Sequence, residues 1–67
     1  MPPRVRTVLR MLRRAGYLYK NSEGSHHHFV DPVTGRKHTI AGNPSKELDK
    51  GAWEFVRYLL SRRIGKK

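Results

Sequence analysis

Residues 24–40 read GSHHHFVDPVTGRKHTI, and this stretch decides the fold that we expect for the chain. Polar and apolar residues alternate with the period of a strand from Ser25 to Val30 and again from Arg36 to Ile40. Between these strands, Asp31–Gly35 contains Asp, Pro and Gly, the residue types that favour turns. The stretch is therefore predicted to form an antiparallel hairpin.

The pairing of these strands sorts the histidines between the two faces of the sheet. A turn between the strands places Phe29 opposite His38 and His27 opposite Ile40. Directly opposed residues share a face, so Phe29 and Ile40 mark the core side, with His27 and His38 beside them. The remaining histidines are expected to point away from the core; these are His26 and His28.

A first helix and a further strand are expected before the hairpin. Apolar residues recur at helical spacing over Arg4–Ala15, and Gly16 would end this helix in a left-handed conformation. A strand over Tyr17–Asn21 and a turn over Asn21–Gly24 would then lead into the hairpin. The arginines of the helix fall on its polar face: Arg6, Arg10, Arg13 and Arg14.

A second helix is expected after the hairpin, from about Asp49 to Arg63, followed by the basic tail Gly65–Lys67. Asp49 suits the N-cap, and Trp53 would be the largest core residue. The apolar stripe that would pack on the sheet is wider: Ala52, Trp53, Phe55, Val56, Leu59, Leu60 and Ile64. The predicted fold class is α+β, a single domain over residues 1–67 with the order α-β-β-β-α. Both helices would cover one face of a three-stranded antiparallel sheet.

The charge of the chain indicates a polyanionic partner. The 67 residues contain 15 Lys and Arg against 5 Asp and Glu, a net charge of +10. Such a charge attracts nucleic acid, while an anionic membrane or an acidic protein is the alternative partner. No Cys is present, which excludes disulfides and thiolate metal sites. Without an apolar run or signal-peptide core, we expect a cytoplasmic protein.

The histidine cluster at residues 26–28 allows four interpretations. It could belong to an affinity tag, although the run is short, internal and part of a strand pattern. It could bind a metal, but His26 and His28 supply only two ligands and no Cys or carboxylate completes the set. A structural role suits His27 and His38. For His26 we favour general acid–base catalysis, because imidazole exchanges protons near neutral pH.

Cleavage of RNA is the reaction that fits these residue types. RNA carries its own nucleophile, the 2′-hydroxyl, so cleavage needs a base, an acid and cations around the phosphate, but no metal. Gly24 would let a phosphate approach the backbone closely. We predict RNA contacts from Gly24, Ser25, Arg6, Arg10, Arg13, Lys20 and Lys37.

Several motifs resemble a known family over most of the chain. They are the helix ending in Ala15-Gly16, the element Gly24–Phe29, Asp31-Pro32, and Lys46-Glu47-Leu48 with Gly51. These motifs are similar to those of the HicA-type toxins of bacterial and archaeal toxin–antitoxin pairs, also called YcfA-like proteins. The sequence departs from the family at two places. Asn21-Ser22-Glu23 stands where the family has Arg or Lys shortly before Gly-Ser, and Ala41–Pro44 stands where Pro-His-Pro is common.

The resemblance implies a fold, an activity and a partner. The fold would be similar to a double-stranded-RNA-binding domain, and the activity would be ribosome-independent cleavage of mRNA. The catalytic residue would be the histidine after Gly-Ser, which is His26; His28 is our candidate for a second proton-transfer group. A HicB-type antitoxin would bind the toxin and cover His26, and no cofactor or membrane is expected. The alternative is a noncatalytic module that binds double-stranded RNA.

Overall fold

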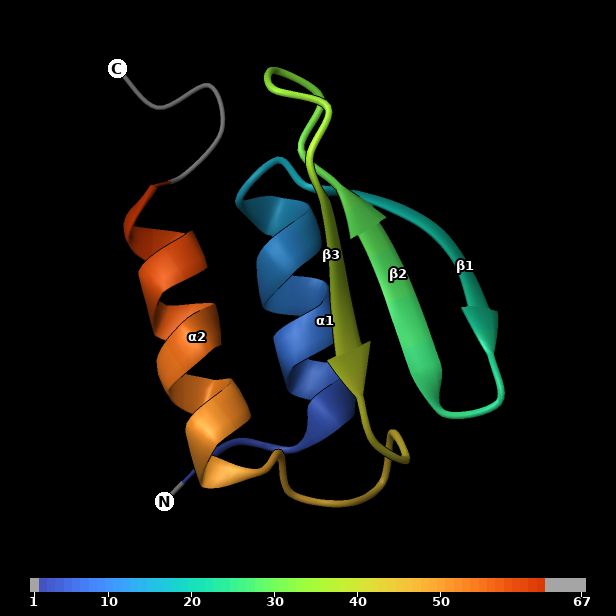
Figure 1. Ribbon diagram of the computed structural model, residues 1–67. Coiled ribbons are helices and arrows are strands. Elements are labelled where there is room, and N and C mark those ends of the chain that lie inside the picture. Colours follow the sequence, from blue (N-terminus) through green and yellow to red (C-terminus); the bar gives the residue numbers. More distant parts are fainter. Residues whose placement is uncertain (1, 63–67) are drawn as a thin grey trace.

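The computed structural model describes residues 2–62. Its elements are α1 (Val5–Arg14), β1 (Leu18–Glu23), β2 (His26–Val30), β3 (Lys37–Ala41) and α2 (Lys50–Ser61). The strands form one antiparallel sheet in the order β1-β2-β3, and both helices lie on the same side of it (Figure 1). The predicted α+β fold and its α-β-β-β-α order are confirmed. Neither described helix is long and apolar enough to cross a membrane.

Gly16 ends α1 as the sequence predicts. Its φ is 105°, and its backbone N–H donates to the carbonyl of Arg13 at 3.0 Å. The N–H of Tyr17 donates to the carbonyl of Leu12, also at 3.0 Å. This pair of bonds is a Schellman motif, which uses the last free carbonyls of a helix and needs a left-handed residue after the cap. The motif directs Tyr17 into the core beside Leu12, and both side chains are buried.

The first hairpin turns later than the sequence predicts. β1 continues to Glu23, and only Gly24 and Ser25 connect it to β2, so the expected turn over Asn21–Gly24 is wrong. Gly24 has φ 62° at the first position of this two-residue loop, which is where a type II′ turn requires glycine. The register shifts between Tyr19 and Asn21, so Lys20 is the extra residue of a β-bulge.

The second hairpin pairs as predicted. Phe29 lies opposite His38, and His27 lies opposite Ile40. The strand bounds differ by one residue, since β2 begins at His26 and β3 covers Lys37–Ala41. The predicted sorting of the four histidines between the two faces therefore holds.

The core lies between the sheet and the helices. Asp49 caps α2 as predicted, because its Oδ2 accepts from the N–H groups of Gly51 and Ala52 at 3.0 and 3.3 Å. Two expectations for α2 are wrong. Phe55 is 41% exposed, and Trp53 only packs against the core from its margin, so Phe29 is the largest fully buried side chain. The buried apolar residues are Val5, Val8, Leu12, Ala15, Tyr17, Phe29, Ile40, Leu48, Val56 and Leu59.

The orientation of α2 explains why Phe55 and Trp53 do not lie in the core as the sequence predicts. Val56 and Leu59 point into the core, and this orientation turns Phe55 toward the edge of the sheet, where its ring meets His38. The helical stripe in the sequence is wider than the surface that a three-stranded sheet can cover. The predicted positions of Arg63, Ile64 and the tail lie outside the described residues.

The loop before α2 closes the N-terminus of α1. The N–H groups of Val5 and Arg6 donate to the carbonyls of Lys46 and Pro44 at 2.9 and 3.0 Å. The N–H of Leu48 donates back to the carbonyl of Pro3 at 2.8 Å. Helix N-termini often bind anions, but here loop carbonyls already occupy part of the first turn.

Candidate active site

His26 stands on the open face of the sheet, at the start of β2. It follows directly after the Gly24-Ser25 loop, and its ring is exposed. Its cross-strand neighbours are Glu23 on β1 and Ala41 on β3. Since alanine is small, one side of the imidazole is left uncovered. No group among residues 2–62 makes a hydrogen bond with the ring, so its nitrogens are available to a substrate.

His28 projects from the same face and is held on both sides. Its Nδ1 lies 3.0 Å from Thr39 Oγ1, and its Nε2 lies 3.4 Å from Glu23 Oε1. The side chain retains 31% of its exposure. His26 and His28 are two residues apart on one strand, so their Cα atoms are separated by about 6.7 Å. Two imidazoles at this spacing can flank a single phosphate group.

A hollow of about 320 Å³ opens beside His28 on this face. Lys20 at the β1 bulge and Lys37 on β3 both line it. The sequence predicted these two lysines as phosphate contacts, and the structure brings them together with His28. The other residues of the wall are Asn21, Glu23, Phe29 and Thr39. His26 is outside the hollow, farther along the same face.

The arginines of α1 are separate from this face, because α1 covers the other side of the sheet. Arg13 lies over the ring of Tyr19 at the β1 edge, 5.1 Å from its centroid. Arg6 Nε donates to the carbonyl of Pro44 at 3.5 Å, a long contact, and Arg10 lies between the two along the helix. The predicted contacts Arg6, Arg10 and Arg13 therefore do not share the open face with His26 and His28, and one RNA would have to pass around the sheet to meet both sets.

His27 and His38 lie on the core side. His27 is only 5% exposed, and its Nε2 lies 3.1 Å from the carbonyl oxygen of Gly42. Because a carbonyl only accepts, His27 carries its proton on Nε2; its Nδ1 is buried with no partner among the described residues. His38 is half-buried, with its ring 5.9 Å from Tyr17 and 5.7 Å from Phe55. These surroundings fit the structural interpretation of both residues.

Sequence reasoning missed the partners of His28. The sequence predicts a turn at Glu23, but this residue ends β1 and lies on the same face as His26 and His28. The signal was present, since alternation in β1 and β3 puts Glu23 and Thr39 on the same face as His28. Within residues 2–62 there is no cluster of three His, Cys, Asp or Glu side chains that could share a metal ion.

The family comparison matches the part of the chain that builds this site. The family model described as the HicA toxin of bacterial toxin–antitoxin systems matches residues 5–54. The chain belongs to the HicA toxin family. A HicA protein is the toxin of a toxin–antitoxin pair, so an antitoxin partner is implied. The matched segment runs from α1 through the sheet into α2 and includes both open-face histidines. No curated protein and no solved structure matches the chain significantly.

Proposed function

We propose that this HicA toxin is a metal-independent endoribonuclease that cleaves mRNA in the cytoplasm, with His26 as the group that exchanges a proton with the 2′-hydroxyl. The observation that carries the proposal is the position of the His26 ring. It is exposed and without a hydrogen-bond partner among residues 2–62, on the same face as a second histidine and a hollow with two lysines. A large polyanion can reach such a surface, and no closed pocket is needed.

The reaction follows from the positions of the two open-face histidines. His26 takes the proton of the 2′-hydroxyl, and the 2′-oxygen forms a bond to phosphorus. The bond between phosphorus and the 5′-oxygen breaks, and His28 gives a proton to that oxygen. The products are a 2′,3′-cyclic phosphate and a 5′-hydroxyl. Lys20 and Lys37 beside His28 would stabilise the negative charge that builds on the phosphate oxygens.

The contacts of His28 suit a group that carries a proton in one step and lacks it in the next. In the charged ring both nitrogens donate, Nδ1 to Thr39 Oγ1 and Nε2 to the Glu23 carboxylate. When Nε2 gives its proton to the 5′-oxygen, Nδ1–H still donates to Thr39 Oγ1. The Thr39 contact therefore holds the ring in both forms, and the longer contact to Glu23 is the one that a 5′-oxygen would replace.

The loop before His26 would bind the RNA backbone close to the cleavage position. Gly24 and Ser25 are exposed, and a Cβ built at Gly24 would meet no atom within 4 Å. The loop is therefore open to a phosphate. The Ser25 carbonyl accepts from the N–H of Gly42 at 2.8 Å, which ties the loop to the residue that follows β3. The arginines of α1 would bind a more distant part of the same RNA.

The antitoxin partner is proposed to be of the HicB type and to cover the open face of the sheet. The toxin carries a net charge of +10. A partner with acidic side chains would therefore be attracted to it and would compete with RNA for Lys20 and Lys37. Covering His26 would block cleavage directly.

The decisive experiment compares wild-type protein with His26→Ala on a labelled mRNA. Because general acid–base catalysis contributes roughly 10²–10⁴-fold, we expect the cleavage rate to fall by about that factor. The circular-dichroism spectrum should not change, and EDTA should not affect the wild type. Analysis of the ends should find a 2′,3′-cyclic phosphate. Full activity of His26→Ala, or 5′-phosphate products, would overturn the proposal.

A noncatalytic double-stranded-RNA-binding module is the second candidate function. The arginine-bearing face of α1 favours it, because a basic helix can bind phosphates without any chemistry. A module of this kind would shift duplex RNA with a steep dependence on salt and leave it intact. If changing both His26 and His28 altered only the salt dependence, the second candidate would be preferred.

A further inference from the structure

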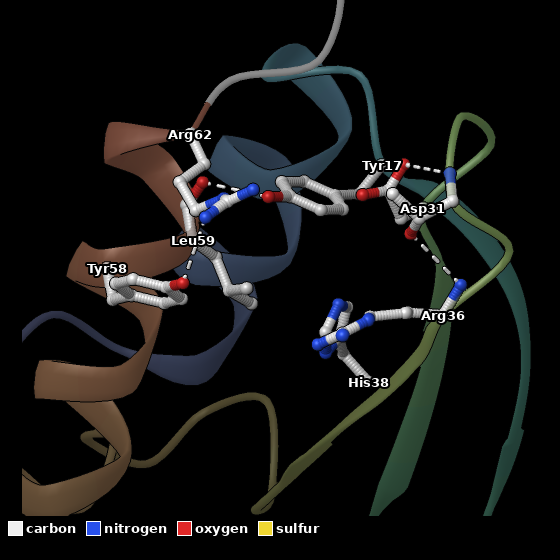
Figure 2. Close-up of a pocket in the computed structure, with 8 residues that line it drawn as sticks. Tyr17, Asp31, Arg36, His38, Tyr58, Leu59 and Arg62 are labelled. Atoms are coloured by element: carbon white, nitrogen blue, oxygen red, sulfur yellow. Dashed lines mark hydrogen bonds between the residues drawn. The ribbon is translucent and has the colours of Figure 1, made fainter.

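A second hollow lies at the other end of the sheet, on the side that the helices cover. Its volume is about 310 Å³, and it is enclosed by the C-terminal half of α2 and the turn between β2 and β3 (Figure 2). Asp31 lies there, about 17 Å along the strand from His26. None of its lining residues lines the hollow beside His28. The wall consists of Tyr17, Asp31, Thr34, Arg36, His38, Tyr58, Leu59 and Arg62.

We propose that this hollow binds one unpaired nucleotide of the RNA, with the base against Tyr58 and the phosphate between Arg36 and Arg62. The inference rests on the proposed ribonuclease function and adds a substrate-binding site away from the cleavage position. A volume near 300 Å³ is at the lower end of the range of small-ligand pockets, which suits a single nucleotide.

Tyr58 offers a fixed aromatic surface. Its side chain is 54% exposed, although it lies on a helix that packs against the core. Arg62 Nη1 donates to its phenol oxygen at 3.1 Å, and the guanidinium carbon lies 5.7 Å from the ring centroid. These contacts restrain the ring before any ligand arrives. Unpaired bases stack on aromatic rings of this kind, and the arginine adds a cation–π contribution.

The cations of the hollow are available for a phosphate. Figure 2 shows the side chains of Arg36 and Arg62 reaching into the space between α2 and the hairpin. Among residues 2–62, neither guanidinium lies within 4.0 Å of a carboxylate. Guanidinium groups bind phosphate through paired N–H donors, so two of them on facing elements make a suitable clamp.

The carboxylate of Asp31 distinguishes a nucleotide from an acidic peptide. Desolvation works to raise its pKa, but the backbone N–H groups of Val33 and Thr34, the Thr34 hydroxyl and nearby His38 lower the pKa overall, so it stays ionised. Oδ1 accepts both N–H groups, at 2.8 and 3.2 Å, while Oδ2 has no partner among the described residues. A carboxylate can accept the N–H groups of a base, and a Glu or Asp side chain of a peptide offers no such donor.

Tyr17 completes the floor without adding negative charge. Burial is the main reason that its pKa is raised, and the charge of Asp31 adds to the effect. The phenol therefore keeps its proton, which it donates to the carbonyl of Leu59 at 2.8 Å. The hollow thus combines an aromatic surface, two guanidiniums and one acceptor, which are the groups that recognise a base and its phosphate together.

The first experiment measures binding of single nucleotides to the wild-type protein by NMR. Nucleoside 5′-monophosphates should shift the amide signals of Arg36, Tyr58 and Arg62, and inorganic phosphate should bind at least about tenfold more weakly, because it cannot stack. Guanosine monophosphate should bind more tightly than uridine monophosphate, because guanine presents N1–H and an amino group side by side to the Asp31 carboxylate, whereas uracil presents only N3–H. Asp31→Asn should reduce that difference.

Matched variants test the assignment. Tyr58→Ala and Arg36→Gln should weaken nucleotide binding by about tenfold, while Tyr58→Phe should keep most of it. Arg57→Gln is the control. Arg57 lies on α2, as Tyr58 does, but it is outside the hollow and contacts Glu54 at 3.5 Å. Thermal unfolding of each variant shows whether it is folded. Equal losses in Arg57→Gln and Arg36→Gln would overturn the proposal.

A cleavage assay separates this proposal from the proposed function. With a long mRNA, Tyr58→Ala should raise KM and leave kcat unchanged, whereas a dinucleotide too short to reach the hollow should show no difference. If nucleotides shift only the signals around His28, or a hexaglutamate peptide binds the hollow more tightly than any nucleotide, the site is not for RNA. Loss of cleavage in His26→Ala is independent of these results.

Discussion

The two faces of strand β2 place histidines in opposite surroundings, one open to solvent and one inside the core. His26 and His27 are neighbours in the chain, yet one ring is exposed and the other is 5% exposed and bonded to the Gly42 carbonyl. Alternation along the strand alone produces this difference. Histidines that are adjacent in the sequence therefore need not lie together in the structure. His26 and His28 share the open face, whereas His27 belongs with Phe29 and Ile40.

The largest effect on the free energy of unfolding is expected from Phe29, on the buried face of β2. Phe29→Ala removes the largest fully buried side chain, and such a change costs about 3–5 kcal/mol. Domains have about 0.05–0.15 kcal/mol of stability per residue, so a chain of 67 residues cannot tolerate much more. We expect the variant to be largely unfolded in the absence of a partner, as measured by urea denaturation followed by circular dichroism.

Val30→Ala is the control for Phe29→Ala, because Val30 is the next residue on the same strand but faces the open side and is only half-buried. Its midpoint of unfolding should shift much less. Equal shifts for the two variants would mean that the buried and open faces have been assigned wrongly.

His27→Ala should separate stability from catalysis. It removes a buried ring and its bond to the Gly42 carbonyl, and the loss of such a contact costs roughly 1–3 kcal/mol. The fraction that stays folded should still cleave RNA at a rate close to wild type. His26→Ala should show the reverse, with unchanged unfolding and almost no cleavage. A folded His27→Ala protein without activity would contradict this division.

A smaller effect is expected on the open face from Glu23→Gln. The change keeps the shape of the side chain but removes the charge that the His28 ring faces at 3.4 Å. Ion pairs this exposed contribute about 0.2–1 kcal/mol, so cleavage should slow by up to about fivefold. Thr39→Val tests the other contact. Single-turnover rates with saturating RNA measure both, and wild-type rates in both variants would show that His28 needs no positioning.

The sequence predicts the fold well where local signals and burial agree. The Phe29–His38 and His27–Ile40 pairs follow from alternation and a turn cluster, and Gly16 marks the end of α1 through its left-handed conformation. The first hairpin was less predictable. Asn21 and Ser22 are ordinary turn formers, but the type II′ loop at Gly24 and the bulge at Lys20 keep them in the strand.

The candidate site could be predicted in part, because alternation along a strand separates exposed from buried residues. His26 and His28 could be placed on the open face because they alternate with buried residues. The Glu23–His28–Thr39 chain depends on the register of all three strands, so a two-residue error in the first turn hid it. The hollow at Tyr58 and Arg62 joins residues far apart in the chain, and no local pattern marks it.

The smallest effect concerns the turn that ends β2, through Asp31. The pKa of Asp31 is lowered in the folded protein from an ordinary value of 3.8, so the ionised form is preferred by the folded state. Its contribution to stability is therefore present above that value and is lost as the pH falls through the lower folded pKa. Asp31→Asn should lower the midpoint of urea unfolding at pH 7, and the difference from wild type should shrink below about pH 3.8. Glu54→Gln is the control. It removes the same charge from an exposed side chain that contacts Arg57, and it should change the midpoint little at pH 7 or at low pH. If the difference in midpoint between Asp31→Asn and wild type stayed constant as the pH fell, the turn would depend on the shape of the Asp31 side chain and not on its charge.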